Sequence, residues 1–121
     1  HLIEAGSDMF LMPSRYEPCG LGQMYAMRYG TVPVVRYTGG LADTVREYYP
    51  TTKLGTGFGF YDYEACRLLM SVAKALYTYS NSRDDWERIF ENCMSQDFSY
   101  ENTARQYKEL YKIAVSAKKK W

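Results

Sequence analysis

Apolar and polar residues follow one pattern in the first half of the chain and another in the second. Short apolar runs at DMFLMP (8–13) and TVPVVRY (31–37) predict two strands, each buried on both faces. Each run leads through a glycine-bearing loop into helix-forming residues, Gly22 to Tyr29 with a stop at Gly30, and 41–49 before Pro50. The repeated order of strand, loop and helix predicts an α/β fold with a parallel sheet.

The second half of the chain has a helical pattern. Residues 50–63, PTTKLGTGFGFYDY, are rich in glycine and threonine and are predicted to form a flexible loop. From about residue 62, apolar residues recur at helical spacing and predict three trailing helices, the third capped by Ser99, with apolar stripes buried in the core. The stripes are Leu68, Leu69, Val72, Ala73 and Leu76; Trp86, Ile89, Phe90, Cys93 and Met94; and Tyr100, Ala104, Tyr107, Tyr111 and Ala114.

The number of strands bears on the domain organisation. Two strands do not make a stable open sheet, because an edge and both faces stay unprotected. The chain does not begin with Met, and its first residues, HLIEAGSD, resemble the end of a helix that runs into a strand. We therefore expect residues 1–121 to be a single partial domain, the second half of a Rossmann-like lobe, with further strands before His1.

Composition and charge exclude several classes of partner. The chain has 121 residues, of which 46% are hydrophobic and 24% charged, as in an ordinary globular protein. The net charge of +1 gives no electrostatic reason to expect nucleic acid or a membrane as a partner, and no apolar run is long enough to cross a bilayer. The basic end AKKKW (117–121) is interpreted as a favourable charge at a helix end.

The metal-binding residue types are few and scattered. Cys19, Cys66 and Cys93 lie far apart, and His1 is the only histidine, which argues against a zinc site. The odd number of cysteines is typical of reduced thiols in a cytosolic or similar compartment. No metal and no cofactor is expected.

The two glycine-bearing loops lie where open parallel α/β sheets bind ligands, outside the carboxyl ends of the strands. Residues 19–22 enter a helix whose first N–H groups are unpaired and attract an anion such as a diphosphate. Residues 38–40 (TGG) occupy the same place after the second strand. Glu17 would repel a phosphate, but its carboxylate suits the hydroxyl groups of a sugar.

A simpler alternative exists for each glycine pattern. The two loops can be tight strand-to-helix turns, with Glu17 in solvent or near the positive end of a helix. Gly55, Gly57 and Gly59 form G-x-G-x-G, which is not the dinucleotide-binding fingerprint and favours a flexible connection.

Residues 13–45, PSRYEPCGLGQMYAMRYGTVPVVRYTGGLADTV, closely resemble the C-terminal lobe of bacterial glycogen synthases and plant starch synthases, glycosyltransferase family 5. GFGF (57–60) and FSYENTARQYKELY (98–111) are similar to the same family, and the resemblance is weakest over 61–96. The resemblance implies part of the Rossmann-like C-terminal lobe of a two-lobed GT-B enzyme. Such an enzyme transfers glucose, with retention of configuration, from ADP-glucose or possibly UDP-glucose to the non-reducing end of an α-1,4-glucan.

The resemblance also implies roles for individual residues. Glu17, the catalytic-site residue, would bind the hydroxyl groups of the donor glucose together with the N–H groups of Cys19 and Gly20. The N–H groups of Leu21 and Gly22 would face the diphosphate. The remaining substrate-binding positions are Tyr25, which stands where the wider superfamily has a ribose-binding glutamate that family 5 commonly lacks, and Thr38, Gly39 and Gly40, which would approach the ligand or acceptor.

Further expectations concern the whole enzyme. The partners are the sugar nucleotide, the glucan and a missing N-terminal lobe that carries the basic phosphate-binding residues, so the fragment alone is expected to be inactive. The location is cytoplasmic in a bacterium or plastidic in a plant. Three alternatives stay open: another GT-B transferase using UDP-sugars, a non-catalytic sugar-nucleotide or glucan-binding module, and a phosphate-binding interaction domain. A glutamate at Tyr25 would favour the first, and an active Glu17→Ala parent would favour the second.

Overall fold

A computed structural model describes residues 1–118. The chain forms an α/β fold in which a short parallel sheet is followed by helices, as the sequence pattern predicts. The elements are α1 (Leu2–Ala5), β1 (Met9–Met12), α2 (Gly22–Arg28), β2 (Val32–Arg36), α3 (Gly40–Thr44), β3 (Phe58–Phe60), α4 (Ala65–Asn81), α5 (Arg83–Met94) and α6 (Tyr100–Lys118).

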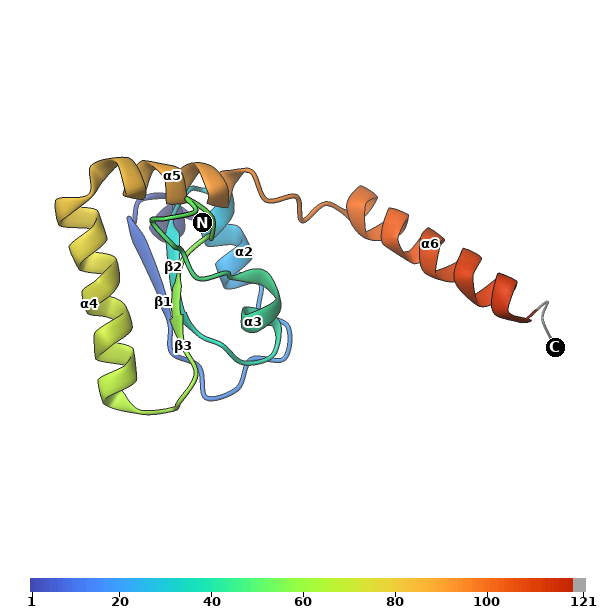
Figure 1. Cartoon of the computed structure of the whole chain (residues 1–121), viewed down its shortest axis with the longest axis horizontal. Helices are drawn as coiled ribbons and strands as arrows, with labels where there is room; N and C mark the ends of the chain where they lie inside the picture. Colours follow the sequence, from blue (N-terminus) through green and yellow to red (C-terminus); the bar gives the residue numbers. More distant parts are fainter. Residues whose placement is uncertain (119–121) are drawn as a thin grey trace.

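The sheet has three strands in the order β1-β2-β3, and both pairs are parallel. Met9 lies opposite Val32, and Val34 lies opposite Phe58. The sheet lies between α4 on one face and α2 and α3 on the other, while α5 crosses one end of the strands (Figure 1). The loops that follow the strands therefore gather at the opposite edge, the carboxyl edge.

The hydrophobic core is centred on β2. Val32 and Val35 are completely buried, because β2 has a strand on each side and helices over both faces. Phe58 from β3 packs against Trp86 of α5, with ring centroids 6.4 Å apart. The other buried core residues come from all layers of the fold: Met27, Val34, Leu41, Val45, Tyr48, Ala75, Ile89 and Cys93.

The prediction that β1 is buried on both faces is wrong for the described residues. Met9, Phe10 and Met12 are half-buried, and Leu11 is 51% exposed. Within residues 1–118, β1 pairs with β2 alone and is an edge strand, so one side of it has no neighbour. An apolar run indicates what a strand can bury, whereas its actual burial depends on the neighbours present.

The predicted helix over 41–49 and the predicted flexible loop over 50–63 both need correction. The helix ends at Thr44, and Val45 is already extended. The following segment instead pairs with residues 54–57: the N–H of Tyr48 donates to the carbonyl of Gly57 at 2.9 Å. The chain then continues directly into β3, so Gly57 and Gly59 belong to ordered backbone in and beside the sheet. Backbone pairing with a distant segment outweighs the helical spacing of Leu41, Val45 and Tyr48.

The three trailing helices exist, and the side chain of Ser99 accepts a hydrogen bond from the N–H of Asn102 at 3.2 Å, as expected for a cap. Their predicted stripes are only partly correct. In α4 the buried face is rotated toward Ser71, Ala75 and Thr78. The predicted stripe members that lie exposed are Leu69, Ala73 and Leu76 in α4, and Phe90 and Met94 in α5.

Helix α6 differs most from its prediction. It extends away from the body of the molecule (Figure 1), and none of its described residues is buried. The stripe that was expected in the core, Tyr107 and Tyr111 included, is therefore exposed. Of the basic end AKKKW, residues 119–121 lie outside the described part of the chain. Over residues 1–118, no helix combines the length and the apolar character that crossing a membrane requires.

Candidate functional site

Two loops at the carboxyl edge of the sheet contain most of the predicted site residues. We call residues 13–21, between β1 and α2, the Glu17 bend, and residues 38–40, between β2 and α3, the glycine turn. Figure 1 shows both at the same end of the sheet, opposite α5. Parallel strands therefore bring these two loops together, as the sequence predicts.

The glycine turn packs directly against the backbone of the Glu17 bend. The N–H of Gly40 donates to the carbonyls of Glu17 and Pro18, at 3.1 and 3.2 Å. A Cβ atom at Gly39 would overlap the carbonyl oxygen of Glu17, and one at Gly40 would overlap that of Cys19. Gly39 also has a positive φ of 48°. The structure thus gives these two glycines a role inside the chain, in letting the two backbones touch.

Arg36, at the end of β2, holds the start of the same bend. Its Nη1 donates to the carbonyl of Arg15 at 2.6 Å, and its Nε donates to the carbonyl of Tyr61 at 2.8 Å. The guanidinium lies over the ring of Tyr63, 5.4 Å from its centroid. Sequence reasoning missed this residue, although a charged side chain at the end of an apolar strand is a usable signal.

The end of the Glu17 bend is fixed by a buried side chain. Gly20 has a left-handed backbone with φ +67°, which few other residues adopt at low cost. Its carbonyl accepts a hydrogen bond from Nε2 of Gln23 at 2.9 Å, and Gln23 is fully buried. The carbonyls of Arg15, Glu17, Pro18 and Gly20 are therefore all engaged within the chain.

This arrangement leaves the N–H groups of the bend free. Among the described residues, no acceptor lies within hydrogen-bond reach of the N–H groups of Cys19, Gly20, Leu21 or Gly22. Glu17 is half-buried, and its carboxylate has no hydrogen-bond or ion-pair partner in residues 1–118. A free carboxylate beside a row of free amide donors can bind a neutral hydroxylated group and an anion next to each other.

The predicted site residues divide between two neighbourhoods. Leu21 and Tyr25 line a cavity of about 610 Å³ together with Phe98, from the segment before α6, and Tyr100, the first residue of α6. Neither Glu17 nor the glycine turn lines this cavity. Tyr25 is 43% exposed and meets His1 edge-on, with ring centroids 5.4 Å apart. The Glu17 bend, the first residue of α2 and the glycine turn contain the remaining predicted residues, namely Glu17, Cys19, Gly20, Gly22, Thr38, Gly39 and Gly40.

A polar cluster holds Tyr37, the residue directly before the glycine turn. The hydroxyl of Tyr37 donates to Oε2 of Glu47 at 3.0 Å, and the N–H of Gly59 donates to the same oxygen at 2.8 Å. Lys74 of α4 forms an ion pair with the other oxygen of Glu47. Burial and the Glu47 carboxylate raise the pKa of Tyr37 far above its usual value, so the phenol stays a neutral donor. Tyr37 and Glu47 were not identified from the sequence.

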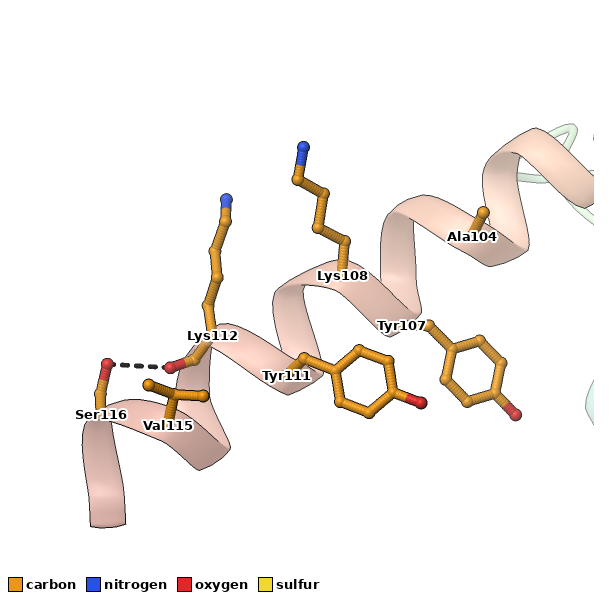
Figure 2. A pocket seen from close by; sticks show the side chains of 7 residues that line it. All are labelled: Ala104, Tyr107, Lys108, Tyr111, Lys112, Val115 and Ser116. Atoms are coloured by element: carbon orange, nitrogen blue, oxygen red, sulfur yellow. Dashed lines mark hydrogen bonds between the residues drawn. The ribbon is translucent and has the colours of Figure 1, made fainter. Parts of the chain in front are cut away.

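The cysteines and a second cavity do not add to the site. Cys19 and Cys66 are exposed free thiols, and Cys93 is buried, with a pKa raised by burial to about 12. The described residues contain no group of His, Cys, Asp and Glu side chains that could hold a metal ion. A cavity of about 700 Å³ follows one face of α6, and Figure 2 shows that all its lining residues come from this single helix, Tyr107 and Tyr111 among them.

Comparison with known proteins finds relatives of this chain among bacterial glycogen synthases. The glycogen synthase of Petrotoga mobilis is 67% identical over 117 residues, which cover 97% of this chain and 24% of that protein. The glycogen synthase of Thermotoga maritima is 60% identical over 114 residues, which cover 94% of this chain and 24% of that protein. The chain thus spans about a quarter of the length of these relatives.

Solved structures agree with this comparison. The catalytic domain of starch synthase IV from Arabidopsis thaliana, bound to ADP and acarbose, matches 94% of this chain and 24% of its own, with a TM-score of 0.81 and 43% identity. Sucrose-phosphate synthase from Thermosynechococcus elongatus matches 96% of this chain and 27% of its own, with a TM-score of 0.63 and 27% identity.

These likenesses confirm the predicted fold, a part of the Rossmann-like lobe of a GT-B glycosyltransferase. Residues 1–90 match the family model described as "Glycosyl transferases group 1". This match covers the sheet, the Glu17 bend, the glycine turn, all of α4 and most of α5. The chain therefore belongs to the group 1 glycosyl transferases, and its relatives include glycogen and starch synthases.

Proposed function

We propose that this chain is the donor-binding part of a retaining glucosyltransferase that extends an α-1,4-glucan, as glycogen and starch synthases do. Residues 1–121 would form a single partial domain, the second half of the nucleotide-sugar-binding lobe with its trailing helices. The rest of the enzyme would supply an N-terminal lobe and the basic phosphate-binding residues. The similarity to glycogen synthases at up to 67% identity supports the reaction class.

One structural observation carries the proposal. Four carbonyls of the Glu17 bend accept hydrogen bonds within the chain, whereas the N–H groups of residues 19–22 and the Glu17 carboxylate have no partner among residues 1–118. A structural turn needs no such separation. A site for a sugar nucleotide does, because hydroxyl groups need an acceptor and a diphosphate needs donors.

The arrangement suggests how the glucosyl transfer proceeds. Glu17 accepts hydrogen bonds from the donor glucose, with help from the N–H groups of Cys19 and Gly20, and holds its reactive carbon toward the acceptor. Negative charge grows on the diphosphate as it departs, and the N–H groups of Leu21 and Gly22 stabilise that charge. Because these donors are fixed by the folded bend, little reorganisation is needed at the moment of reaction.

The donor nucleotide belongs to this proposal. We favour ADP-glucose over UDP-glucose, because the starch synthase neighbour is described with ADP and resembles the chain more than the sucrose-phosphate synthase does. The exposed Tyr25 stands where a ribose-binding glutamate is found in the wider superfamily, which also favours the glycogen and starch synthase branch. The bacterial relatives favour a cytoplasmic rather than a plastidic location.

The cysteines provide a footprinting test of donor binding. Cys19 and Cys66 are both exposed, and Cys19 alone lies in the Glu17 bend. We expect saturating ADP-glucose to slow the alkylation of Cys19 by iodoacetamide in the full-length protein about tenfold, and to leave the rate at Cys66 unchanged. Mass spectrometry of the labelled peptides gives both rates. Cys93 should stay unlabelled until the protein unfolds, because its thiol is buried and its pKa is about 12.

The outcomes of this footprint separate the alternatives. Protection by UDP-glucose but not by ADP-glucose would favour the UDP-sugar transferases. Protection of Cys19 in a full-length protein that transfers no glucose would favour a non-catalytic binding module. Equal labelling of Cys19 with and without either sugar nucleotide would contradict the proposed site.

A further inference from the structure

A chain of hydrogen bonds through two side chains links the Glu17 bend to helix α3. The Nε2 of Gln23 donates to the carbonyl of Gly20 at 2.9 Å and to Oγ1 of Thr44 at 3.0 Å. Oγ1 of Thr44 in turn donates to the carbonyl of Gly40 at 2.6 Å. The last residue of α3 and the second residue of α2 therefore connect the end of the bend with the end of the glycine turn.

The direction of these hydrogen bonds follows from the chemistry of the groups. A threonine hydroxyl has one proton, and Thr44 uses it toward the carbonyl of Gly40, which can only accept. Thr44 must therefore accept its other hydrogen bond, and only the NH₂ group of Gln23 can donate it. The carbonyl of Gly20 and the hydroxyl of Thr44 thus require an amide NH₂ at this point, and a carboxylate or a thioether cannot replace it.

The amide of Gln23 also shapes the bend by contact. Gln23 is fully buried, and a Cβ atom at Gly20 would lie only 2.6 Å from its Oε1. The side chain therefore packs on the bare Cα of Gly20, the residue with the left-handed backbone. Its position determines where the Gly20 peptide lies, and with it the direction of the N–H groups that follow.

We infer that Gln23 and Thr44 are positioning residues for the sugar-nucleotide donor, which act by fixing the free N–H groups of the Glu17 bend against the glycine turn. This inference rests on the proposed function and deepens it. Neither side chain touches the donor. Their loss leaves every proposed ligand group present but allows the bend to shift, and a misplacement of about 1 Å lowers catalysis substantially.

The kinetic test uses the full-length protein with ADP-glucose and glycogen. We expect Gln23→Met, which keeps the side-chain volume, and Gln23→Glu, which loses both donated hydrogen bonds, to lower kcat/KM for ADP-glucose by roughly 10- to 100-fold. Thr44→Val should lower kcat/KM for ADP-glucose about tenfold. Thr44→Ser, which keeps the hydroxyl, should have a kcat/KM within about twofold of the wild type. The KM for glycogen should stay within about twofold in all of them.

A matched control is present in α4. Thr78 donates to the carbonyl of Lys74 four residues earlier, as Thr44 does to Gly40, and it is buried, whereas Thr44 is half-buried. Thr78 belongs to the last turn of α4, which leads into α5, and the Glu17 bend lies at the opposite end of the sheet (Figure 1). Thr78→Val should leave kcat/KM for ADP-glucose within about twofold of the wild type. The double variant Gln23→Met, Thr44→Val should lose no more of its kcat/KM for ADP-glucose than Gln23→Met alone, because both residues act through the hydrogen bond that joins them.

Each outcome has one meaning. A Gln23→Met or Thr44→Val protein that unfolds like the wild type and keeps its kcat/KM for ADP-glucose would overturn the inference, as would equal losses for the donor and for glycogen. Equal effects of Thr44→Val and Thr78→Val on stability and activity would also overturn it, since that result describes a structural role alone. A fully active Glu17→Ala protein would contradict the proposed function itself. If Glu17→Ala is inactive but the Gln23 and Thr44 variants keep full activity, the proposed function stands and this inference alone is wrong.

Discussion

Replacing Glu17 by alanine is expected to reduce kcat/KM for ADP-glucose in the full-length protein roughly 100- to 1,000-fold. The carboxylate accepts hydrogen bonds from the donor glucose, and these contacts orient the reactive carbon in the transition state. Steady-state glucan synthesis with ADP-glucose and glycogen measures the loss. Glu17→Gln keeps the size of the side chain but removes the charge, so we expect a smaller yet clear reduction.

The same substitution should leave the folded protein intact. Glu17 is half-buried, and its carboxylate has no partner among residues 1–118. We therefore expect the free energy of unfolding of the Glu17→Ala protein to stay within about 0.5 kcal/mol of the wild type. Exposed Glu87, which pairs with Arg83 on the surface of α5, provides a charge-matched control whose change to alanine should not affect activity. Full activity of Glu17→Ala would contradict the assigned role.

Replacing Gly40 by alanine is expected to destabilise the protein by roughly 2 to 4 kcal/mol, with a large loss of activity. The added methyl group would overlap the carbonyl of Cys19, so the glycine turn and the Glu17 bend cannot both keep their positions. The N–H of Gly40 would then lose its hydrogen bonds to Glu17 and Pro18. Urea unfolding of the full-length protein measures the change in stability.

Gly6 provides the control for this substitution. It has an ordinary φ of −100°, and a Cβ atom there would meet only the carbonyl of Leu2, at 3.1 Å. Gly6→Ala should therefore change the free energy of unfolding by less than about 1 kcal/mol. If Gly40→Ala were as stable and as active as Gly6→Ala, the two loops could not be packed as described.

The parts of the fold that sequence predicted well are those decided by local pattern. β2 follows from its β-branched run, and α2 follows from its helix formers and from Gly30, which has a φ of +80°. The parts predicted poorly depend on distant neighbours. β3 is a three-residue strand with glycine at its centre, too short to show a period, and it forms because β2 lies beside it.

The same distinction applies to the candidate site. Glu17 and the amides after it were identified because they are contiguous in the sequence and resemble a known motif. Arg36, Glu47 and Thr44 were not assigned a role, because their partners are Arg15, Gly59 and Gln23, which lie 12 to 21 residues away. Sequence reasoning found the groups that would touch a ligand and missed those that hold them in place.

The glycine turn shows how the structure changes an interpretation. From the sequence, Gly39 and Gly40 were expected to allow a ligand to approach the backbone closely. In the structure, the carbonyl of Glu17 lies against Gly39 and the carbonyl of Cys19 lies against Gly40, where a side chain would otherwise be. The glycines are needed for contact between two parts of the chain, and any role in binding the ligand or acceptor stays a prediction.

The central claim, that the Glu17 bend binds the sugar and diphosphate of the donor, is tested most directly by a crystal structure of the full-length protein with ADP and glucose. We predict diphosphate oxygens at about 2.7–3.2 Å from the N–H groups of Leu21 and Gly22, with a glucose hydroxyl at the carboxylate of Glu17. A structure in which ADP binds elsewhere, while other parts of the protein cover these N–H groups, would contradict the account.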